Sequence, residues 1–201
     1  MRVLLTTAMI VVMSGCTYNA KVSESALAVK ANHGQKSPKG ITLIDNRDSL
    51  QVSTFKVQNY TGNVDARDAF FDATKSMLGT VYSKVDVSMS AKPENELYAV
   101  ASYDTKLPDP GPVTTMIVND VKLEVYDTAT KQPIHTFTAS KEDRASGSPG
   151  LRMITGLTLF IISPITIPIE THQIGSEGEE IVTKNLKTAL AEFRAKLAAN
   201  P

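Results

Sequence analysis

The sequence contains no tryptophan and a single cysteine, Cys16, among its 201 residues. One cysteine cannot form an intramolecular disulfide, and the remainder of the chain has no thiolate for a metal site or for nucleophilic catalysis. Aromatic residues make up 6% of the chain, so a stacking platform for carbohydrate is not supported. The fold must therefore be held together by an ordinary hydrophobic core.

The chain also lacks an excess of charge of either sign. Lysine and arginine number 21, as do aspartate and glutamate, and they are dispersed rather than gathered in runs. Nucleic-acid binding requires a basic face that neutralises phosphates, and this composition argues against one. We predict no nucleic-acid partner.

Linear catalytic and metal-binding motifs are missing as well. The three histidines, His33, His135 and His172, are far apart in the sequence, and no HExxH pattern, nucleophile elbow, Walker motif or dinucleotide glycine pattern occurs. Asp65, Asp68 and Asp72 have helical spacing, which is more typical of a solvated surface than of an acid–base pair. We predict a protein that is not an enzyme, with no metal and no cofactor.

The first fifteen residues have the layout of a secretory signal peptide. Arg2 is followed by an apolar run from Val3 to Met13 and then by small residues. Eleven residues form a helix of only about 16 Å, against the roughly 30 Å of a hydrocarbon core, so a permanent transmembrane helix is a poor interpretation.

The segment Met13-Ser14-Gly15-Cys16 resembles the lipobox of bacterial lipoproteins, although Met13 stands where leucine is usual. The resemblance implies cleavage before Cys16 and palmitate-type acylation of that cysteine, so that a lipid anchor attaches the chain to a membrane. Thr17 follows in place of the aspartate that retains lipoproteins in the inner membrane. The implied location is the periplasmic face of the outer membrane. The alternative is an incidental cysteine within an ordinary signal peptide.

Composition then predicts the domain organisation. Small and polar residues dominate from Thr17 to Lys39, with turn formers at 32–40 and a weak helical pattern at 23–31. We predict a signal peptide at 1–15, a lipidated N-terminus and flexible tether at 16–39, and a single periplasmic domain at 40–201.

Hydrophobic periodicity predicts the elements of that domain. Strands are expected at 41–44, 85–90 and 97–103, with a less regular extended stretch at 50–57, and a hairpin is expected at 118–140 with its turn at 127–133. Two helices are expected. The first, near 63–84, is expected to be capped by Asn63 or Asp65 and to bury Ala66, Phe70, Ala73, Met77 and Val81. The second, at 177–199, carries the apolar stripe Ile181, Leu186, Leu190, Phe193 and Leu197.

These elements predict an α+β fold, a layered sandwich of a mostly antiparallel sheet with two main helices in the order β-α-β-β-β-β-α. The strand at 97–103 is apolar on both faces and is expected at the centre of the sheet. On a lipid anchor, this element order resembles the periplasmic α/β domains of penicillin-binding-protein activator lipoproteins and of the curli secretion-channel lipoprotein.

The stretch MITGLTLFIISPITIPI, residues 153–169, contains no charge. Pro164 and Pro168 and its length disfavour a transmembrane helix, and its alternation is too short for a membrane β-hairpin. It is predicted either as core, with a short helix at 153–162 and an edge strand at 165–169, or as an exposed surface against a protein or a membrane. The candidate contact residues are Leu157, Phe160, Ile161, Ile165 and Ile167.

We therefore hypothesise a non-catalytic, lipid-anchored protein whose periplasmic domain binds another envelope protein, as a regulator or an assembly factor. The alternative is a carrier of small apolar or lipid ligands that uses residues 153–169 as a pocket lining. A hydrolase with a site that leaves no linear motif is a third possibility. Oligomeric state does not follow from the sequence.

Overall fold

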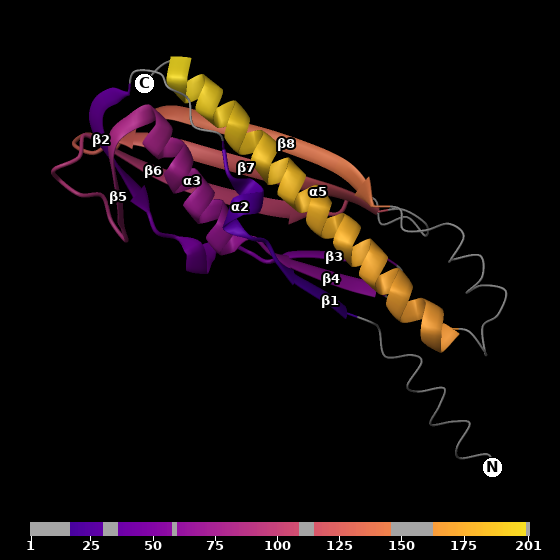
Figure 1. Cartoon of the computed structure of the whole chain (residues 1–201). Coiled ribbons are helices and arrows are strands. Elements are labelled where there is room, and N and C mark those ends of the chain that lie inside the picture. The colour runs from indigo at the N-terminus through magenta and orange to yellow at the C-terminus, as the bar shows by residue number, and fades with distance from the viewer. Residues whose placement is uncertain (1–16, 30–35, 58–59, 109–114, 146–162, 200–201) are drawn as a thin grey trace, which may run out of the picture.

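The computed structural model describes residues 17–29, 36–57, 60–108, 115–145 and 163–199. The elements lie in two sheets with helices packed against them (Figure 1). In chain order they are β1 (Thr17–Lys21), α2 (Glu24–Leu27), β2 (Ser37–Ile44), a 3-10 turn (Arg47–Ser49), β3 (Ser53–Val57), β4 (Tyr60–Asp65), α3 (Arg67–Val81), β5 (Tyr82–Ser88), β6 (Leu97–Lys106), β7 (Thr115–Asp127), β8 (Pro133–Ala145) and α5 (Ser163–Ala199).

The larger sheet has five strands in the order β5-β2-β6-β7-β8. β2 pairs in parallel with β5 and β6, and the longer ladders β6–β7 and β7–β8 are antiparallel. The predicted hairpin is confirmed as β7 and β8, whose turn contains Lys131 at a φ of 58°. The strand predicted at the centre is β6, and it does occupy the central position.

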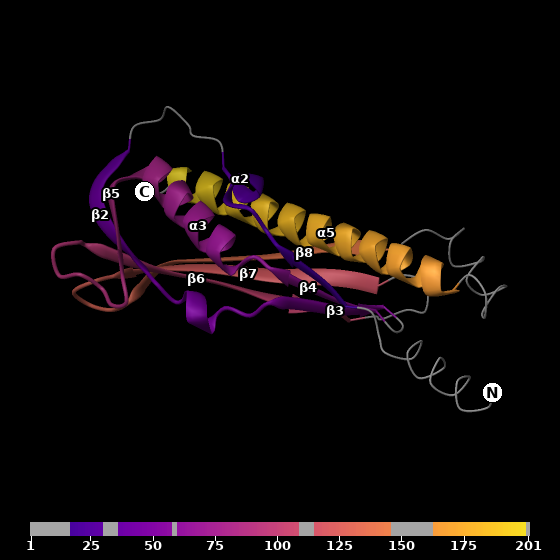
Figure 2. The ribbon, with the colours of Figure 1, turned by 60° about the horizontal axis from the view of Figure 1, so that its bottom comes forward.

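The two main helices, α3 and α5, lie along one face of this sheet, as Figure 2 shows. The residues predicted to line α3 are all buried, and so are those of the α5 stripe. β6 and β7 bury alternate residues beneath the helices, whereas the side chains between them, such as Tyr98 and Tyr126, are half-buried on the opposite face. The fold is thus an α+β layered sandwich, and most of its paired residues lie in antiparallel ladders.

The smaller sheet was not predicted as a sheet, although its strand β3 lies within the extended stretch expected at 50–57. It has three strands in the order β1-β4-β3, in which β1 and β4 are parallel and β3 and β4 are antiparallel. The expected flexible tether at 16–39 differs from this structure, because Thr17–Lys21 is paired in a strand and Leu27 of α2 is fully buried. The pairing of β1 with β4 joins residues more than forty positions apart, so no local pattern in the sequence predicts it.

The last helix is longer than predicted. α5 begins at Ser163, not at Glu177, so the edge strand expected at 165–169 is wrong: these residues lie in the first turns of a helix. Pro164 is tolerated there because the first four amide groups of a helix have no acceptor within it. The short helix predicted at 153–162 falls outside the described residues.

Two glycines of α5 lie where the helix meets the smaller sheet. Gly175 and Gly178 interrupt the helical pattern, but in the structure they let α5 approach the smaller sheet closely. A Cβ on Gly178 would lie 2.2 Å from Cζ of Phe55, and one on Gly62 of β4 would lie 2.1 Å from the same atom. The buried Phe55 ring therefore fills the space between two glycines, one on the sheet and one on the helix.

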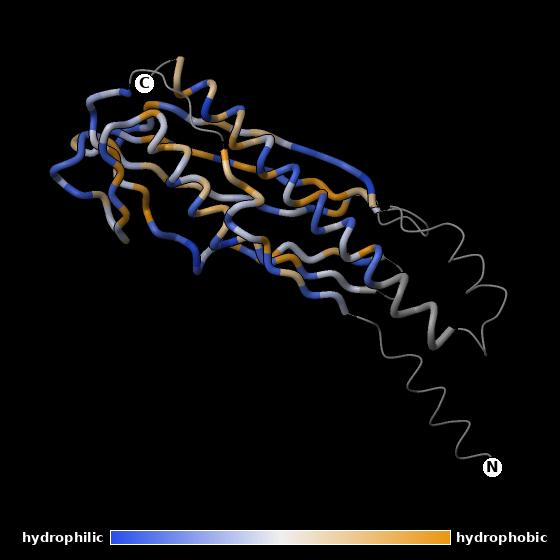
Figure 3. The backbone as a smooth tube through the Cα atoms, in the orientation of Figure 1, coloured by the Kyte–Doolittle hydropathy of each residue, from blue (hydrophilic) through white to orange (hydrophobic). Residues whose placement is uncertain are grey.

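Hydropathy follows this packing. Figure 3 shows hydrophobic and hydrophilic residues alternating along the coloured part of α5, as expected of a helix with one face on the sheets. The C-terminal part of β8, Lys141–Arg144, is hydrophilic, and Lys141 and Asp143 form ion pairs with Glu192 and Lys184 of α5. The core consequently lies between the sheets and one side of α5.

Candidate functional site

The residues singled out from the sequence fall mostly beyond the described ranges. Cys16, Leu157, Phe160 and Ile161 lie outside them, so the predicted acylation and those contacts stay predictions. Ile165 and Ile167 lie in the first two turns of α5. Their role in binding a partner or ligand also stays a prediction.

The start of β1 and the start of α5 lie at one end of the molecule. β1 begins at Thr17, the residue directly after Cys16, and the start of α5 lies at the same end (Figure 1). The Tyr18 hydroxyl donates a hydrogen bond of 2.7 Å to Glu179 Oε2, and the Tyr18 ring lies 5.7 Å from that of His172. The N-terminus of the fold is therefore fixed against α5, and we refer to this region as the anchor end.

Burial and the neighbouring carboxylate change the ionisation of Tyr18. Desolvation, and then the hydrogen bond and charge of Glu179, raise the pKa of the Tyr18 phenol to about 12. The phenol therefore stays neutral and remains a donor to Glu179 at any physiological pH. This contact holds the first strand to the helix.

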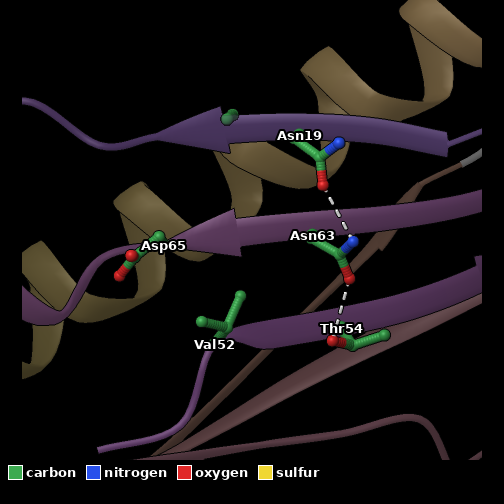
Figure 4. Close-up of a pocket in the computed structure, with 6 residues that line it drawn as sticks. Asn19, Val52, Thr54, Asn63 and Asp65 are labelled. Atoms are coloured by element: carbon green, nitrogen blue, oxygen red, sulfur yellow. Dashed lines mark hydrogen bonds between the residues drawn. The ribbon is translucent and has the colours of Figure 1, made fainter. Parts of the chain in front are cut away.

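A polar hollow lies on the outer face of the smaller sheet (Figure 4). Its volume is about 420 Å³, and it is lined by Asn19, Ala20, Val52, Thr54, Asn63 and Asp65. Asn63 Nδ2 donates to Asn19 Oδ1 at 2.9 Å, and Thr54 Oγ1 donates to Asn63 Oδ1 at 3.0 Å. These three residues are register partners on adjacent strands, so the hydrogen bonds form a ladder across the sheet.

Asp65 closes one side of this hollow. Arg67 donates to both of its carboxylate oxygens, from Nε at 2.9 Å and from Nη2 at 2.8 Å, and the Arg67 backbone N–H also donates to Oδ1. These bonds hold the pKa of the Asp65 carboxyl below its usual value. The expected capping role is met in part: Asp65 binds the first amide of α3, while the residue at the N-cap position is Ala66.

A second hollow, of about 640 Å³, lies at the opposite end, between the β5–β6 loop and the β7–β8 turn. Asn95 is 1% exposed and donates from Nδ2 to Thr42 and to Asp86, while its Oδ1 accepts no hydrogen bond from the described residues. Thr128 Oγ1 is likewise buried without a described partner. The lining offers hydroxyl, amide, carboxylate and ammonium groups.

The histidines and surface carboxylates do not converge. His135 stacks on Phe137 in β8, His172 lies on α5, and His33 is outside the described residues. Asp68 pairs with Lys21 at 2.8 Å and with Arg47 at 3.7 Å. No group of three potential metal ligands occurs within the ranges that the structure describes.

The β8 edge of the larger sheet, whose other edge strand is β5, is another notable surface. β8 pairs with β7 on one side, and no described strand pairs with its other side. Its first eight residues, Pro133–Ser140, carry no formal charge with histidine neutral, and Ile134 is 47% exposed. Unpaired backbone groups along such an edge can pair with a strand of another protein.

Sequence reasoning missed the asparagine ladder and the hollow near Asn95. Asn19 lies in the predicted tether and Asn63 in the predicted start of a helix, so neither was expected on a strand. The alternation of polar residues in TYNAK and TGNVD is the signal that was available, but each run is short. Only their pairing places the amides side by side.

No protein-family model and no curated protein matches this sequence. Solved structures of similar shape include a Xanthomonas campestris protein described as DUF330, at 8% identity over 86% of this chain and 98% of that one, with a TM-score of 0.43. A hypothetical protein from Chlamydia trachomatis has 12% identity, coverages of 81% and 99%, and a TM-score of 0.41. A minor lipoprotein from Acinetobacter baumannii has 8% identity, coverages of 83% and 95%, and a TM-score of 0.37. At these values the similarities do not assign the chain to a family.

The length and apolar character of the helices determine whether any of them could cross a membrane. Within the described part of the chain, no helix combines the length and the apolar character needed to cross a membrane. α5 has 37 residues, but charged residues recur along it from Glu170 onwards.

Proposed function

We propose that this chain is a lipid-anchored, non-catalytic protein of the bacterial envelope, whose domain binds another envelope protein. The observation that carries the proposal is the lipobox-like sequence Met13–Cys16 after a signal-like segment. β1 begins at the next residue, Thr17, and is fixed to α5. Acylation of Cys16 would therefore hold the folded domain directly at the membrane, without an intervening tether.

The proposed protein contact is the free edge of β8. An added strand would pair with the exposed backbone groups of Pro133–Ser140, and the exposed Ile134 would supply an apolar contact. The charged residues that follow, Lys141–Arg144, would limit the register of such a pairing. Attachment to a membrane confines both proteins to a thin layer and raises their effective concentration, so a weak interface is sufficient.

The proposed location is the periplasmic face of the outer membrane, because Thr17 occupies the position where an aspartate retains lipoproteins in the inner membrane. Radiolabelled palmitate should enter the wild-type chain and should not enter Cys16→Ser. Density-gradient fractionation of cells should place the wild type with the outer membrane and Thr17→Asp with the inner membrane. Normal processing of Cys16→Ser to a soluble product would contradict the anchor.

The protein contact is tested by photocrosslinking from Thr136 in intact cells. We expect one specific crosslinked product, which Ile134→Lys removes and Met89→Lys retains. Met89 is the matched control because it is an exposed hydrophobic residue, 76% accessible, in the β5–β6 loop. An unchanged crosslink in Ile134→Lys would exclude the β8 edge, and an apolar compound extracted from the purified protein would favour the ligand-carrier alternative.

A further inference from the structure

The N-terminal part of α5 extends beyond the rest of the described fold at the anchor end. His172 contacts the Tyr18 ring, and Gly175 lies against the same side chain. Tyr18 is the second residue of β1, so these contacts mark the level at which the smaller sheet ends. Nine residues of α5, Ser163 to Thr171, precede His172 and at 1.5 Å each project about 13 Å further.

The projecting part of α5 lies at the same end of the fold as the start of β1 (Figure 1). β1 runs from Thr17, next to Cys16, to Lys21, and its contacts with α5 place Tyr18 near residues 172–179. In Figures 1 and 2 the start of α5 and the start of β1 lie at the same end of the molecule, while the C-terminus of α5 lies at the other. The helix start and Thr17, the residue that follows the acylation position, therefore lie at the same end of the fold (Figure 1).

The composition of the projecting turns suits lipid. Ser163–Ile169 reads SPITIPI, with three isoleucines, two prolines and no charge, and the first charged residue of the helix is Glu170. Seven residues span about 10 Å, far less than the roughly 30 Å of a hydrocarbon core. This segment can enter one leaflet but cannot cross the bilayer.

We infer that the first two turns of α5, Ser163–Ile169, insert into the interfacial region of the bilayer beside the acyl chains of Cys16. The inference rests on the proposed lipid anchor and deepens it: the protein would contact the membrane through lipid and helix together, and this second contact would fix the orientation of the domain. Because the segment lacks lysine and arginine, its insertion depends on apolar burial and not on anionic lipids.

The absence of tryptophan in the wild type permits a clean test. The full-length chain is expressed with Ile167→Trp, purified from cells after processing and reconstituted in phosphatidylcholine vesicles with brominated acyl chains. Met89→Trp is the control, because Met89 is exposed in the loop at the opposite end of the fold. We expect bromolipid to quench the tryptophan fluorescence of Ile167→Trp at least threefold more than that of Met89→Trp, with no change on addition of anionic lipid or salt.

Aqueous acrylamide separates the other outcomes. If acrylamide quenches Ile167→Trp as strongly as it quenches Met89→Trp, the turns lie in water. Shielding of the introduced indole from both quenchers would mean that the turns are buried against protein, either in this chain or in a second copy. Each of these results would overturn the inference.

Two further measurements keep the result unambiguous. Mass spectrometry of the same sample reports acylation of Cys16, so a chain that is acylated but not quenched contradicts only the helix insertion, whereas an unacylated chain contradicts the anchor. If Ile167→Trp fails to fold, as judged by its thermal transition, Thr166→Trp carries the reporter at the adjacent position.

Discussion

At the scale of single residues, the contact of Phe55 with two glycines is a tight constraint that joins the smaller sheet to α5. The ring is 1% exposed, and hypothetical Cβ atoms on Gly62 and Gly178 would lie within 2.2 Å of it. Neither backbone can retreat independently, because Gly62 is paired in β4 and Gly178 lies within a helix that also packs on β8. Adding a methyl group there must displace the ring or the helix.

We predict that Gly178→Ala lowers the free energy of unfolding by about 1–3 kcal/mol, the usual cost of overpacking a core. Gly79→Ala is the matched control, since Gly79 also lies within a helix but a Cβ there would meet no atom within 4 Å. That control should stabilise the protein by about 0.5–1 kcal/mol, because alanine favours the helix. Urea unfolding measures both, and equal effects of the same sign would contradict the close approach.

At the scale of elements, a largely buried chain of polar side chains joins α5 to both sheets. Asn185 Nδ2 donates to Asn119 Oδ1 at 2.9 Å and to the Lys141 carbonyl at 3.2 Å, so one amide links α5, β7 and β8. Asn119 then donates to Thr105 of β6, which shares a hydrogen bond with Ser53 of β3. The chain fixes the position of α5 along its axis, which hydrophobic packing alone specifies less well.

We predict that Asn185→Leu destabilises the fold by about 1–3 kcal/mol, because Asn119 Oδ1 loses its donor within the core. Asn185 is 4% exposed, so water cannot easily replace the amide. Thr188→Ala, which removes an exposed hydroxyl bonded to the Lys184 carbonyl on the same helix, should change stability by less than about 0.5 kcal/mol. Thermal or urea unfolding of both variants checks the difference, and similar small effects would show that the amide chain contributes little.

At the scale of the whole molecule, paired aspartates are distributed over both sheets. Arg47 holds the pKa of Asp45 below its ordinary value of 3.8, Arg67 does so for Asp65, and Lys184 does so for Asp143. Asn95, and then Lys84, lower the pKa of Asp86 in the same way. Each of these carboxyls binds protons less readily in the folded chain than in the unfolded chain.

The sign of the resulting pH dependence follows from linkage. Stability from these aspartates is fully present above a pH of roughly 5 and is lost as the pH falls through 3.8 and below, because the unfolded chain then takes up more protons. We predict that the urea midpoint is nearly constant between about pH 7 and pH 5 and decreases steadily from about pH 5 to pH 3. In Asp65→Asn this decrease should be smaller than in the wild type, and an acid dependence identical in the two chains would exclude Asp65 as a contributor.

Prediction from the sequence succeeded where the signal was local. The stripe of α3, the stripe of α5 and the β7–β8 hairpin each follow from periodicity within one segment, and the residues concerned are buried as expected. The start of α5 is earlier than predicted because local patterns set the uncharged, proline-containing stretch 153–169 apart from the helix, while Glu177, Glu179 and Glu180 favour a start near 177. Gly175 and Gly178 both lie inside the helix. Here they serve close packing against Phe55 and Tyr18, a requirement that arises only once those residues are in place.

Some candidate sites follow from a contiguous sequence pattern, and others form only through tertiary contacts. The lipobox is a contiguous pattern, so the sequence alone determined the predicted acylation at Cys16 and the absence of charge from 153 to 169. The sequence alone does not determine the ladder of Asn19, Asn63 and Thr54, the free edge of β8 or the position of the α5 start at the same end as β1. These features depend on contacts between distant segments. Local periodicity depends on residues that are close in the sequence, so it can be recognised there. Strand pairing and helix placement depend on the free energy of the whole chain, and only the tertiary structure decided these two features.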